Sequence, residues 1–439
     1  MEVFFIRALQ LIMALSLLVL VHEFGHFIFS RIFKVRVEKF YLFFDWGFSL
    51  FKWKPKNSET EYGVGWIPLG GYCKISGMID ESMDTEQMKQ PAQPWEFRSK
   101  PAWQRLLIMV GGVMFNFILA MFIYAMVLFT WGESYVDIRK ATYGMEFNEN
   151  AKSLGFADGD IILQVDGNDV TRYNVDLLRA IADGKEVTVL RANENVAIEI
   201  PEEFGLLDMG KETPFMQYRI PAVIDSILPA SAAYNAGLQK GDSIVSIGGE
   251  QIASWNGLMM AMQKMKDSGT QDIAMQVMRD SLVSLTAKAD STYKLGITPR
   301  ATGYPVETLE YSLAESFPAG FAYGWNVAKG YVSDFKYLFS KEGAQSVGMF
   351  GTIGSLFPAM WDWHQFWLMT AMLSLILAVM NILPIPALDG GHVLFLLIEV
   401  ITRRKPSDKV LEYAQMVGMF ILLALFVLAT YNDAMRFIF

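Results

Sequence analysis

Long runs of apolar residues occur four times along the chain, and the segments between them are richer in polar and charged positions. A helix rises 1.5 Å per residue, so about 20 apolar residues cross the roughly 30 Å hydrocarbon core of a membrane. Trp and Tyr near the ends of the runs are typical of the membrane–water interface. We therefore predict four transmembrane helices, at Phe4–Phe29, Trp103–Trp131, Phe366–Leu383 and Ala414–Tyr431.

The first apolar run contains three ionisable side chains, in the motif His22-Glu23-Phe24-Gly25-His26. The two histidines are four residues apart, so on a helix they share a face and can bind one ion. In the His-Glu-x-x-His pattern of metallohydrolases, the histidines bind zinc and the glutamate activates water. A chance match is the alternative, but burying three polar side chains in lipid without a function is costly. The motif therefore predicts Zn2+ bound by His22 and His26, with Glu23 as the catalytic residue.

The third apolar run ends in a segment that cannot continue a helix, NILPIPALDGG at positions 381–391. Pro384 and Pro386 remove backbone donors and break the helix. Broken backbone at membrane depth is tolerated only where it lines a cavity or a site. Asp389 then either caps a following helix, His392–Ile401, or completes the metal site. Because the histidine motif lacks a third ligand, we favour Asp389 as that ligand.

The long segment between the second and third runs contains an internal repeat. The stretches Gly155–Gly167 and Gly237–Gly249 share glycines, an aspartate and alternating apolar positions at a constant offset. Each predicts a Gly-Asp turn, a strand and a hairpin turn, followed by a helix at Val175–Ala182 or Trp255–Lys266. Two successive α+β modules are the simplest explanation of the repeat.

Charge predicts the orientation of the chain in the membrane. Basic residues are concentrated at 31–105 and 403–409, which places both segments on the cytoplasmic side. The segment Glu133–Glu310 is then external; it has 16 basic against 26 acidic residues and accounts for the net charge of −9. The basic patches are short and juxtamembrane, which suits anionic lipid head groups and gives no indication of nucleic-acid binding. The chain has one cysteine, Cys73, so no intramolecular disulfide can form.

Together these motifs resemble the site-2 protease family of intramembrane zinc metalloproteases. The resemblance rests on His-Glu-Phe-Gly-His in the first run, on Asn-x-x-Pro-x-Pro-x-Leu-Asp-Gly-Gly in the third, and on the paired modules. The modules resemble PDZ domains in the circular arrangement of bacterial proteases. The resemblance implies that residues matching His22, His26 and Asp389 hold zinc, that Glu23 is the general base, and that Asn381 contacts the substrate backbone.

The resemblance also bears on segments with weaker signals. Trp46–Lys54 and Glu61–Leu69 are expected to pair as a β-hairpin, which in the family dips into the membrane beside the zinc. Its edge near Gly65 is expected to hold an unwound substrate as an added strand. In the second run Gly112 replaces the proline of the family's Gly-Pro-x-x-Asn, a change expected to affect packing more than chemistry. Asn116 is expected to form an interhelical hydrogen bond.

The predicted fold class is therefore a multi-span α-helical membrane protein, with four transmembrane helices, a membrane-dipping β-hairpin and two external α+β PDZ-like modules. The strand edges 143–147 and 219–224 are either peptide-binding edges or ordinary paired strands, and the modules could instead act as a steric filter. Aromatic residues and lysines alternate at 312–349, which predicts an amphipathic helix on the outer membrane face. The predicted domains are 1–132 (helices one and two with the hairpin), 133–215 and 216–305 (the two modules), 306–365 (the amphipathic segment) and 366–439 (helices three and four).

The predicted function is that of an intramembrane zinc metalloprotease that cleaves single-span membrane proteins. An anti-sigma factor already cut externally and remnant signal peptides are the expected substrates; substrates and membrane lipids are the expected partners. The expected location is the bacterial inner membrane, with the modules periplasmic and the active site near the cytoplasmic side. Two alternatives remain: a non-enzymatic PDZ membrane sensor, and a membrane-anchored zinc peptidase acting on soluble chains. The sensor predicts that Glu23→Gln behaves like wild type, and the peptidase predicts equal cleavage of unfolded soluble chains.

Overall fold

The computed structural model describes residues 2–68, 70–78, 90–210, 213–289, 293–300, 303–338, 340, 343, 348–405 and 407–437. The chain divides into two compact units. One contains Met1–Glu133 and Glu310–Phe439, and the other contains Ser134–Leu309.

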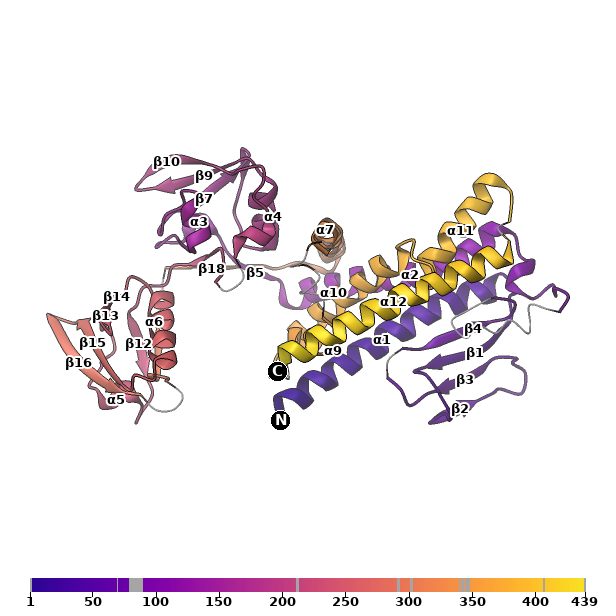
Figure 1. The fold of residues 1–439 in the computed structure, drawn as a ribbon, viewed down its shortest axis with the longest axis horizontal. Coiled ribbons are helices and arrows are strands. Elements are labelled where there is room, and N and C mark those ends of the chain that lie inside the picture. The colour runs from indigo at the N-terminus through magenta and orange to yellow at the C-terminus, as the bar shows by residue number, and fades with distance from the viewer. Residues whose placement is uncertain are drawn as a thin grey trace. The chain divides into compact units, whose positions relative to one another are not determined.

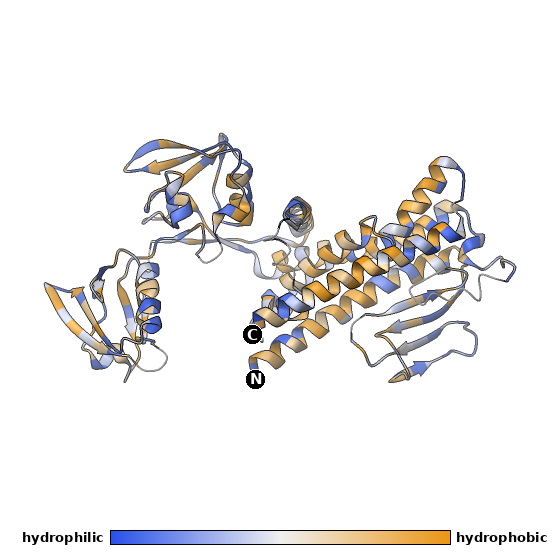
Figure 2. Cartoon of the chain, in the orientation of Figure 1, coloured by the Kyte–Doolittle hydropathy of each residue, from blue (hydrophilic) through white to orange (hydrophobic). Residues whose placement is uncertain are grey.

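Four helices among the described residues are long and apolar enough to span a membrane, as predicted. The helices are α1 (Glu2–Ile32), α2 (Ala102–Trp131), α10 (Trp363–Ile382) and α12 (Asp408–Phe437). Three of them, α1, α2 and α10, contact one another, and the fourth, α12, contacts the short helix α9, Phe350–Leu356 (Figure 1). Apolar residues dominate along all four (Figure 2). The chain is thus a multipass membrane protein.

Helix α2 is the centre of the first unit, because it contacts α1, α10, α7 (Leu313–Leu338) and α11 (Asp389–Thr402). Gly25 of α1 meets Gly111 of α2 so closely that a Cβ on Gly25 would lie 2.3 Å from the Gly111 carbonyl oxygen. Small residues permit such close helix crossings. The crossing places the histidine motif of α1 directly against α2.

Helix α7 corresponds to the predicted amphipathic segment, and one of its faces packs against α2. Gly320 and Gly324 leave room for the α2 residues that they meet, Ala125 and Met121. Most of positions 339–347 of the predicted segment lie outside the described residues, and α9 (Phe350–Leu356) follows. Large aromatic residues on α7 stay exposed: Phe317, Phe321, Tyr323 and Trp325.

The predicted hairpin is part of a larger sheet. Its two strands pair antiparallel, with Phe51 opposite Val64, but they are shorter than expected. Two further strands extend the pair into a four-stranded sheet of order β2-β3-β1-β4, in which β1 runs parallel to β3 and antiparallel to β4. Strand β4 therefore forms one edge, and both β1 and β4 contact α1. The strands are β1 (Val37–Leu42), β2 (Phe51–Trp53), β3 (Glu61–Val64) and β4 (Tyr72–Ile75), and the short helix η2 (Phe97–Ser99) precedes α2.

The break between α10 and α11 occurs at the two prolines, as predicted. The turn folds back so tightly that a Cβ on Gly390 would lie 2.0 Å from the Leu383 carbonyl oxygen, so only glycine fits there. Ala387 has a φ of 79°, in the left-handed region that a residue with a side chain rarely adopts. Asp389 is the first residue of α11, and no side chain caps this helix, so the capping alternative for Asp389 is wrong.

The second unit contains two hydrophobic cores, one within residues 138–216 and one within 222–295. Two four-stranded sheets have matching orders, β10-β9-β7-β8 and β14-β13-β15-β16, as the internal repeat requires. Strand β5 (Glu133–Val136) pairs with β18 (Val306–Leu309), so the two ends of the segment meet. The first half contains η3 (Ile138–Lys140), β6 (Met145–Phe147), α3 (Glu149–Ser153), β7 (Ile161–Val165), β8 (Asn168–Asp169), α4 (Val175–Asp183), β9 (Glu186–Arg191), β10 (Glu194–Glu199), η4 (Leu206–Met209) and β11 (Met216–Tyr218). The second half contains β12 (Ile224–Ile227), α5 (Ala232–Asn235), β13 (Ser243–Ile247), β14 (Glu250–Gln251), α6 (Trp255–Asp267), β15 (Asp272–Met278), β16 (Leu282–Lys288) and β17 (Ile297–Pro299).

Each half of the second unit contains a buried ion pair whose aspartate belongs to the internal repeat and whose arginine does not. The Arg191 guanidinium donates to both carboxylate oxygens of Asp160, at 2.8 and 2.6 Å. In the second half Arg279 donates to Asp242 in the same way, at 2.7 and 2.8 Å. Both aspartates are almost completely buried. Such bidentate pairs fix the Gly-Asp turn against a neighbouring strand.

The two strand edges proposed for peptide binding are already paired. Met145 of β6 exchanges backbone hydrogen bonds with Gly159 and Asp160, while β6 also pairs with β11. Ile224 pairs with Pro299 of β17 and also bonds to the turn at 241–242. Neither strand is an open edge, so of the two alternatives for these segments the structure supports ordinary paired strands.

Candidate active site

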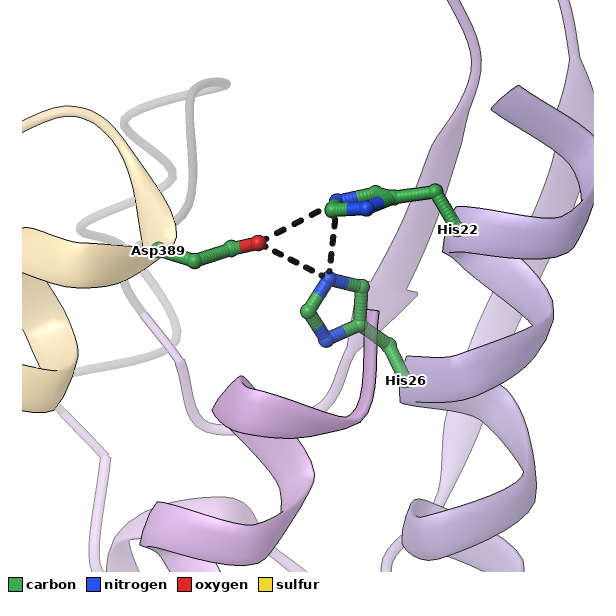
Figure 3. A group of neighbouring side chains, drawn as sticks. All are labelled: His22, His26 and Asp389. Carbon is green, nitrogen blue, oxygen red and sulfur yellow. Dashed lines mark hydrogen bonds and ion pairs between the residues drawn. The ribbon is translucent and has the colours of Figure 1, made fainter. Parts of the chain in front are cut away.

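Three side chains from distant parts of the chain meet between α1 and the start of α11 (Figure 3). His22 and His26 extend from one face of α1, one turn apart, and Asp389 comes from the first turn of α11. The Asp389 Oδ2 atom lies 3.1 Å from Nε2 of His22 and 3.4 Å from Nε2 of His26. The two Nε2 atoms are 3.2 Å apart. The predicted metal ligands are therefore neighbours, although sequence separates Asp389 from the histidines by more than 360 positions.

The chemistry of these three atoms fits a cation. The Ile108 carbonyl oxygen lies 2.9 Å from Nδ1 of His26. A carbonyl only accepts hydrogen bonds, so Nδ1 holds the proton and the Nε2 of the neutral ring presents a lone pair to Asp389. The Asp389 Oδ2 atom is buried without a hydrogen-bond donor. Electron-rich atoms at this spacing repel one another unless a positive ion lies between them.

The spacing also fits zinc. Ligands at about 2.0–2.1 Å from a tetrahedral ion lie about 3.3 Å from one another. The three separations between the donor atoms of His22, His26 and Asp389 span 3.1–3.4 Å. Two imidazoles and one carboxylate leave one tetrahedral position open, which is the arrangement of a catalytic zinc site.

Glu23 lies beside this triad and faces the same cavity. Its carboxylate is within hydrogen-bonding reach of the Cys73 backbone N–H, on the edge strand β4. This contact holds the side chain between the donor triad and the sheet. The position suits a general base, which must reach both the attacking water and the substrate.

The cavity has a volume of about 980 Å³ and extends from the triad to the sheet. Asn381 lines it, with Nδ2 3.5 Å from Nε2 of His22. Residues 71–75, which include all of β4, form another wall. Sequence reasoning missed β4 because a four-residue strand with no regular alternation gives little signal.

Gly65 does not line the cavity. Its N–H donates to the Leu42 carbonyl, and a Cβ there would lie 2.2 Å from the Phe44 carbonyl oxygen. The glycine thus allows a close approach within the sheet, and its backbone donor is already used. The substrate contact of Gly65 stays a prediction; residues 71–75 of the sheet line the cavity and Gly65 does not.

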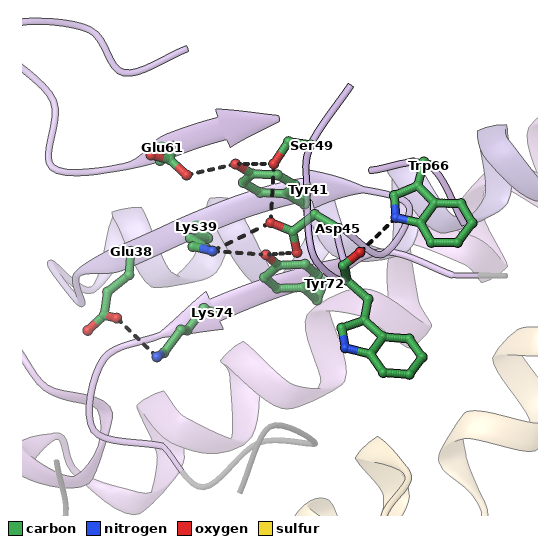
Figure 4. A network of polar contacts seen from close by, with 10 residues as sticks. Glu38, Lys39, Tyr41, Asp45, Ser49, Glu61, Trp66, Tyr72 and Lys74 are labelled. Atoms are coloured by element: carbon green, nitrogen blue, oxygen red, sulfur yellow. Dashed lines mark hydrogen bonds and ion pairs between the residues drawn. The ribbon is translucent and has the colours of Figure 1, made fainter. Parts of the chain in front are cut away.

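The loop between β1 and β2 is fixed beside the cavity by a network of polar contacts (Figure 4). The Tyr72 hydroxyl donates to Oδ1 of Asp45 at 2.8 Å, and Lys39 Nζ lies 3.6 Å from Oδ2 of Asp45. The Trp66 indole N–H donates to the Trp46 carbonyl at 2.8 Å. Asp45, Trp46 and Tyr72 also line the cavity, so the network fixes part of its wall.

The two remaining histidines differ in their surroundings. His392 lines the cavity one turn after Asp389, but it is not in the group whose donor atoms converge. His364 packs against Trp131, with ring centroids 5.2 Å apart. Among the described residues, only His22, His26 and Asp389 form a group that could hold a metal ion.

Comparison with known proteins agrees with this geometry. The sequence profile of Peptidase family M50 matches residues 10–425. The chain is 28% identical to Regulator of sigma-E protease RseP of Escherichia coli K12, over 97% of each chain. It is also 28% identical to RseP of Salmonella typhimurium strain 14028s and to Protease RseP of Yersinia pestis, again over 97% of each chain.

The chain belongs to Peptidase family M50. It is a zinc-dependent intramembrane metalloprotease of the site-2 type.

Proposed function

We propose that the protein cleaves single-span membrane proteins within or near their transmembrane segment. The observation that carries this proposal is the donor triad of His22, His26 and Asp389, which opens into a cavity bordered by the edge strand β4. The relatives named as regulators of sigma E suggest an anti-sigma factor, already trimmed outside, as one substrate. Remnant signal peptides are a second class with the same topology.

In this proposal the residues have separate roles. His22, His26 and Asp389 hold zinc, which when bound supplies Lewis-acid activation of water and of the scissile carbonyl. Glu23 takes a proton from the attacking water and passes it to the leaving amine. Asn381 orients the substrate backbone next to the triad.

A transmembrane helix must unwind locally before it can be cut, because its amides are bonded within the helix. Each freed group then needs a new partner in a region with little water. We propose that β4 supplies these partners, so that the substrate pairs with residues 71–75 as an added strand. The Cys73 N–H near Glu23 marks where the scissile bond would lie along this edge.

The aromatic loop beside the sheet would contact the membrane. Trp46 is 82% exposed, and Phe48, Leu50 and Phe51 are also largely exposed. Exposed apolar patches of this kind mark membrane or protein contacts. We propose that this loop inserts into the bilayer beside the cavity, in the inner membrane of a bacterium, with the sheet on the cytoplasmic side.

We propose that the segment 133–305 forms two PDZ-like modules on the periplasmic side, divided near 216, and that 306–365 lies at the outer membrane face. The modules would admit substrates whose external domain has already been removed. With β6 and β12 paired on both sides, a peptide would have to add to another strand that ends a sheet, such as β11 or β17.

The test uses purified full-length protein in lipid vesicles with a tagged single-span peptide. Wild type should cut within the span, and Glu23→Gln or an added chelator should abolish the cut, which mass spectrometry would locate. A water-soluble unfolded chain of similar length is the matched control and should be cut far more slowly. Equal cleavage of the soluble chain would refute the membrane-substrate proposal, and unchanged cleavage by Glu23→Gln would refute the catalytic assignment.

A further inference from the structure

The face of α2 that meets the histidine motif makes three contacts at a spacing of one helical turn. Ile108, Gly112 and Asn116 are four residues apart, so they lie along one side of the helix. The Ile108 carbonyl accepts from Nδ1 of His26 at 2.9 Å. The Asn116 amide nitrogen, Nδ2, lies 3.3 Å from Nδ1 of His22, and a half-turn of the amide would put Oδ1 in its place.

Gly112 lies between these two contacts and makes both possible. A Cβ at this position would lie 2.4 Å from Nε2 of His26 and 2.7 Å from Cε1 of His22. Any side chain would therefore push both rings away from α2. The expectation that Gly112 stands in the family's proline position is wrong by one residue: with Asn116 as the asparagine of Gly-Pro-x-x-Asn, Gly112 holds the glycine position and Val113 the proline position. The nearest neighbours of a Cβ at Gly112 are the two histidines of the motif.

Asn116 is poorly explained as a residue that only stabilises the helix packing. It is completely buried, and its Oδ1 atom has no hydrogen-bond partner. A buried amide that is half satisfied costs stability, whereas an apolar side chain of similar size would not. Its backbone carbonyl accepts a hydrogen bond from the buried Ser374 of α10 at 2.8 Å, which fixes this turn of α2 in place.

We propose that this face of α2 sets the tautomer and orientation of both histidine ligands, with Asn116 as the positioning residue for His22. For Nε2 of His22 to bind zinc, the neutral ring must have its proton on Nδ1. The amide of Asn116, turned so that Oδ1 faces the ring, accepts that proton. The Ile108 carbonyl does the same for His26. Such partners on the far side of a ligand ring typically change metal affinity 10- to 100-fold.

The test measures zinc affinity by competition with a chromogenic chelator, using full-length protein in detergent. Asn116→Leu removes the acceptor at similar size and should weaken zinc binding about 10- to 100-fold. Asn116→Asp keeps an acceptor and should bind zinc within about threefold of wild type or more tightly. Gln10→Leu is the matched control, since Gln10 is a fully buried amide of α1 that bonds to Ile6 and Pro358 instead. It should leave zinc affinity unchanged.

Thermal unfolding in the presence of chelator separates the proposal from a general folding defect. We expect the metal-free Asn116→Leu protein to unfold at the same temperature as wild type or higher, because a half-satisfied buried amide is removed. Zinc affinity within twofold of wild type in Asn116→Leu would overturn the proposal. So would an equally large loss in Asn116→Asp. Because the readout is metal binding, the result does not depend on which substrates the enzyme cleaves.

Discussion

The crossing of α1 and α2 predicts a large effect from a very small substitution, Gly25→Ala. Gly25 lies between His22 and His26 in the motif, and an added Cβ would lie 2.3 Å from the Gly111 carbonyl oxygen and 2.8 Å from the Gly112 nitrogen. Such contacts are rarely shorter than about 3.2 Å, so the helices must separate locally by about 1 Å. A displacement of this size in a catalytic group can reduce the rate about 100-fold. We therefore expect cleavage of a single-span reporter to fall by about two orders of magnitude.

Intrinsic helix propensity acts in the opposite direction, since alanine is favoured over glycine inside a helix by about 1 kcal/mol. A loss of activity with preserved helix content would therefore point to the geometry of the crossing. The matched control is Gly354→Ala in α9, where the nearest atom to an added Cβ is 3.7 Å away. The assay compares initial cleavage rates in vesicles, with circular dichroism for helix content. Activity of Gly25→Ala within twofold of the control would refute this reasoning.

Three further predictions follow from other contacts. Glu23→Gln should lower the cleavage rate at least about 1,000-fold yet keep bound zinc. Elemental analysis measures the zinc content, and loss of zinc would instead make Glu23 a structural residue. Burial opposes ionisation of Asp242, but the Arg279 guanidinium outweighs burial and lowers the pKa of this carboxyl below its ordinary 3.8. The ion pair therefore stabilises the fold at neutral pH, and this stabilisation is lost as the pH falls below about 4. Hydrogen exchange in β13, corrected for intrinsic rates, should show acid opening in wild type and little further change in Asp242→Asn. The ion pair of Arg105 Nη2 and Glu399 Oε1, 2.5 Å apart, joins α2 to α11, the helix that begins with Asp389. Glu399→Arg should therefore reduce activity strongly, and the added Arg105→Glu should restore part of it. Absence of any rescue would contradict a direct pairing.

The features that could be predicted from the sequence are those with a strong local signal. An apolar run of about 20 residues has few alternatives to a membrane span, and two prolines one residue apart must end a helix. The ends of the spans were less certain, because polar residues such as Glu2 and Arg31 continue α1 beyond its apolar stretch. Asp389 could be proposed as a ligand because only one acidic residue follows the broken helix directly.

The features that escaped prediction depend on contacts between distant segments. Strand β1 pairs in parallel with β3 across about 20 residues, and no local pattern indicates such a partner. The arginine partners of Asp160 and Asp242 were missed because Arg191 and Arg279 do not keep the offset of the repeat. The predicted interhelical contact of Asn116 is present, but its partner, His22, could not be predicted because it depends on how α1 crosses α2.

The central claim is that two histidines of α1 and one aspartate at the start of α11 bind the same zinc ion. Zinc K-edge X-ray absorption of the purified protein tests it most directly, with Asp389→Ala measured alongside. We predict a first shell of nitrogen and oxygen ligands only, with two imidazoles, and a changed or vanished spectrum in Asp389→Ala. A sulfur ligand from Cys73, or a spectrum that Asp389→Ala leaves unchanged, would contradict the account.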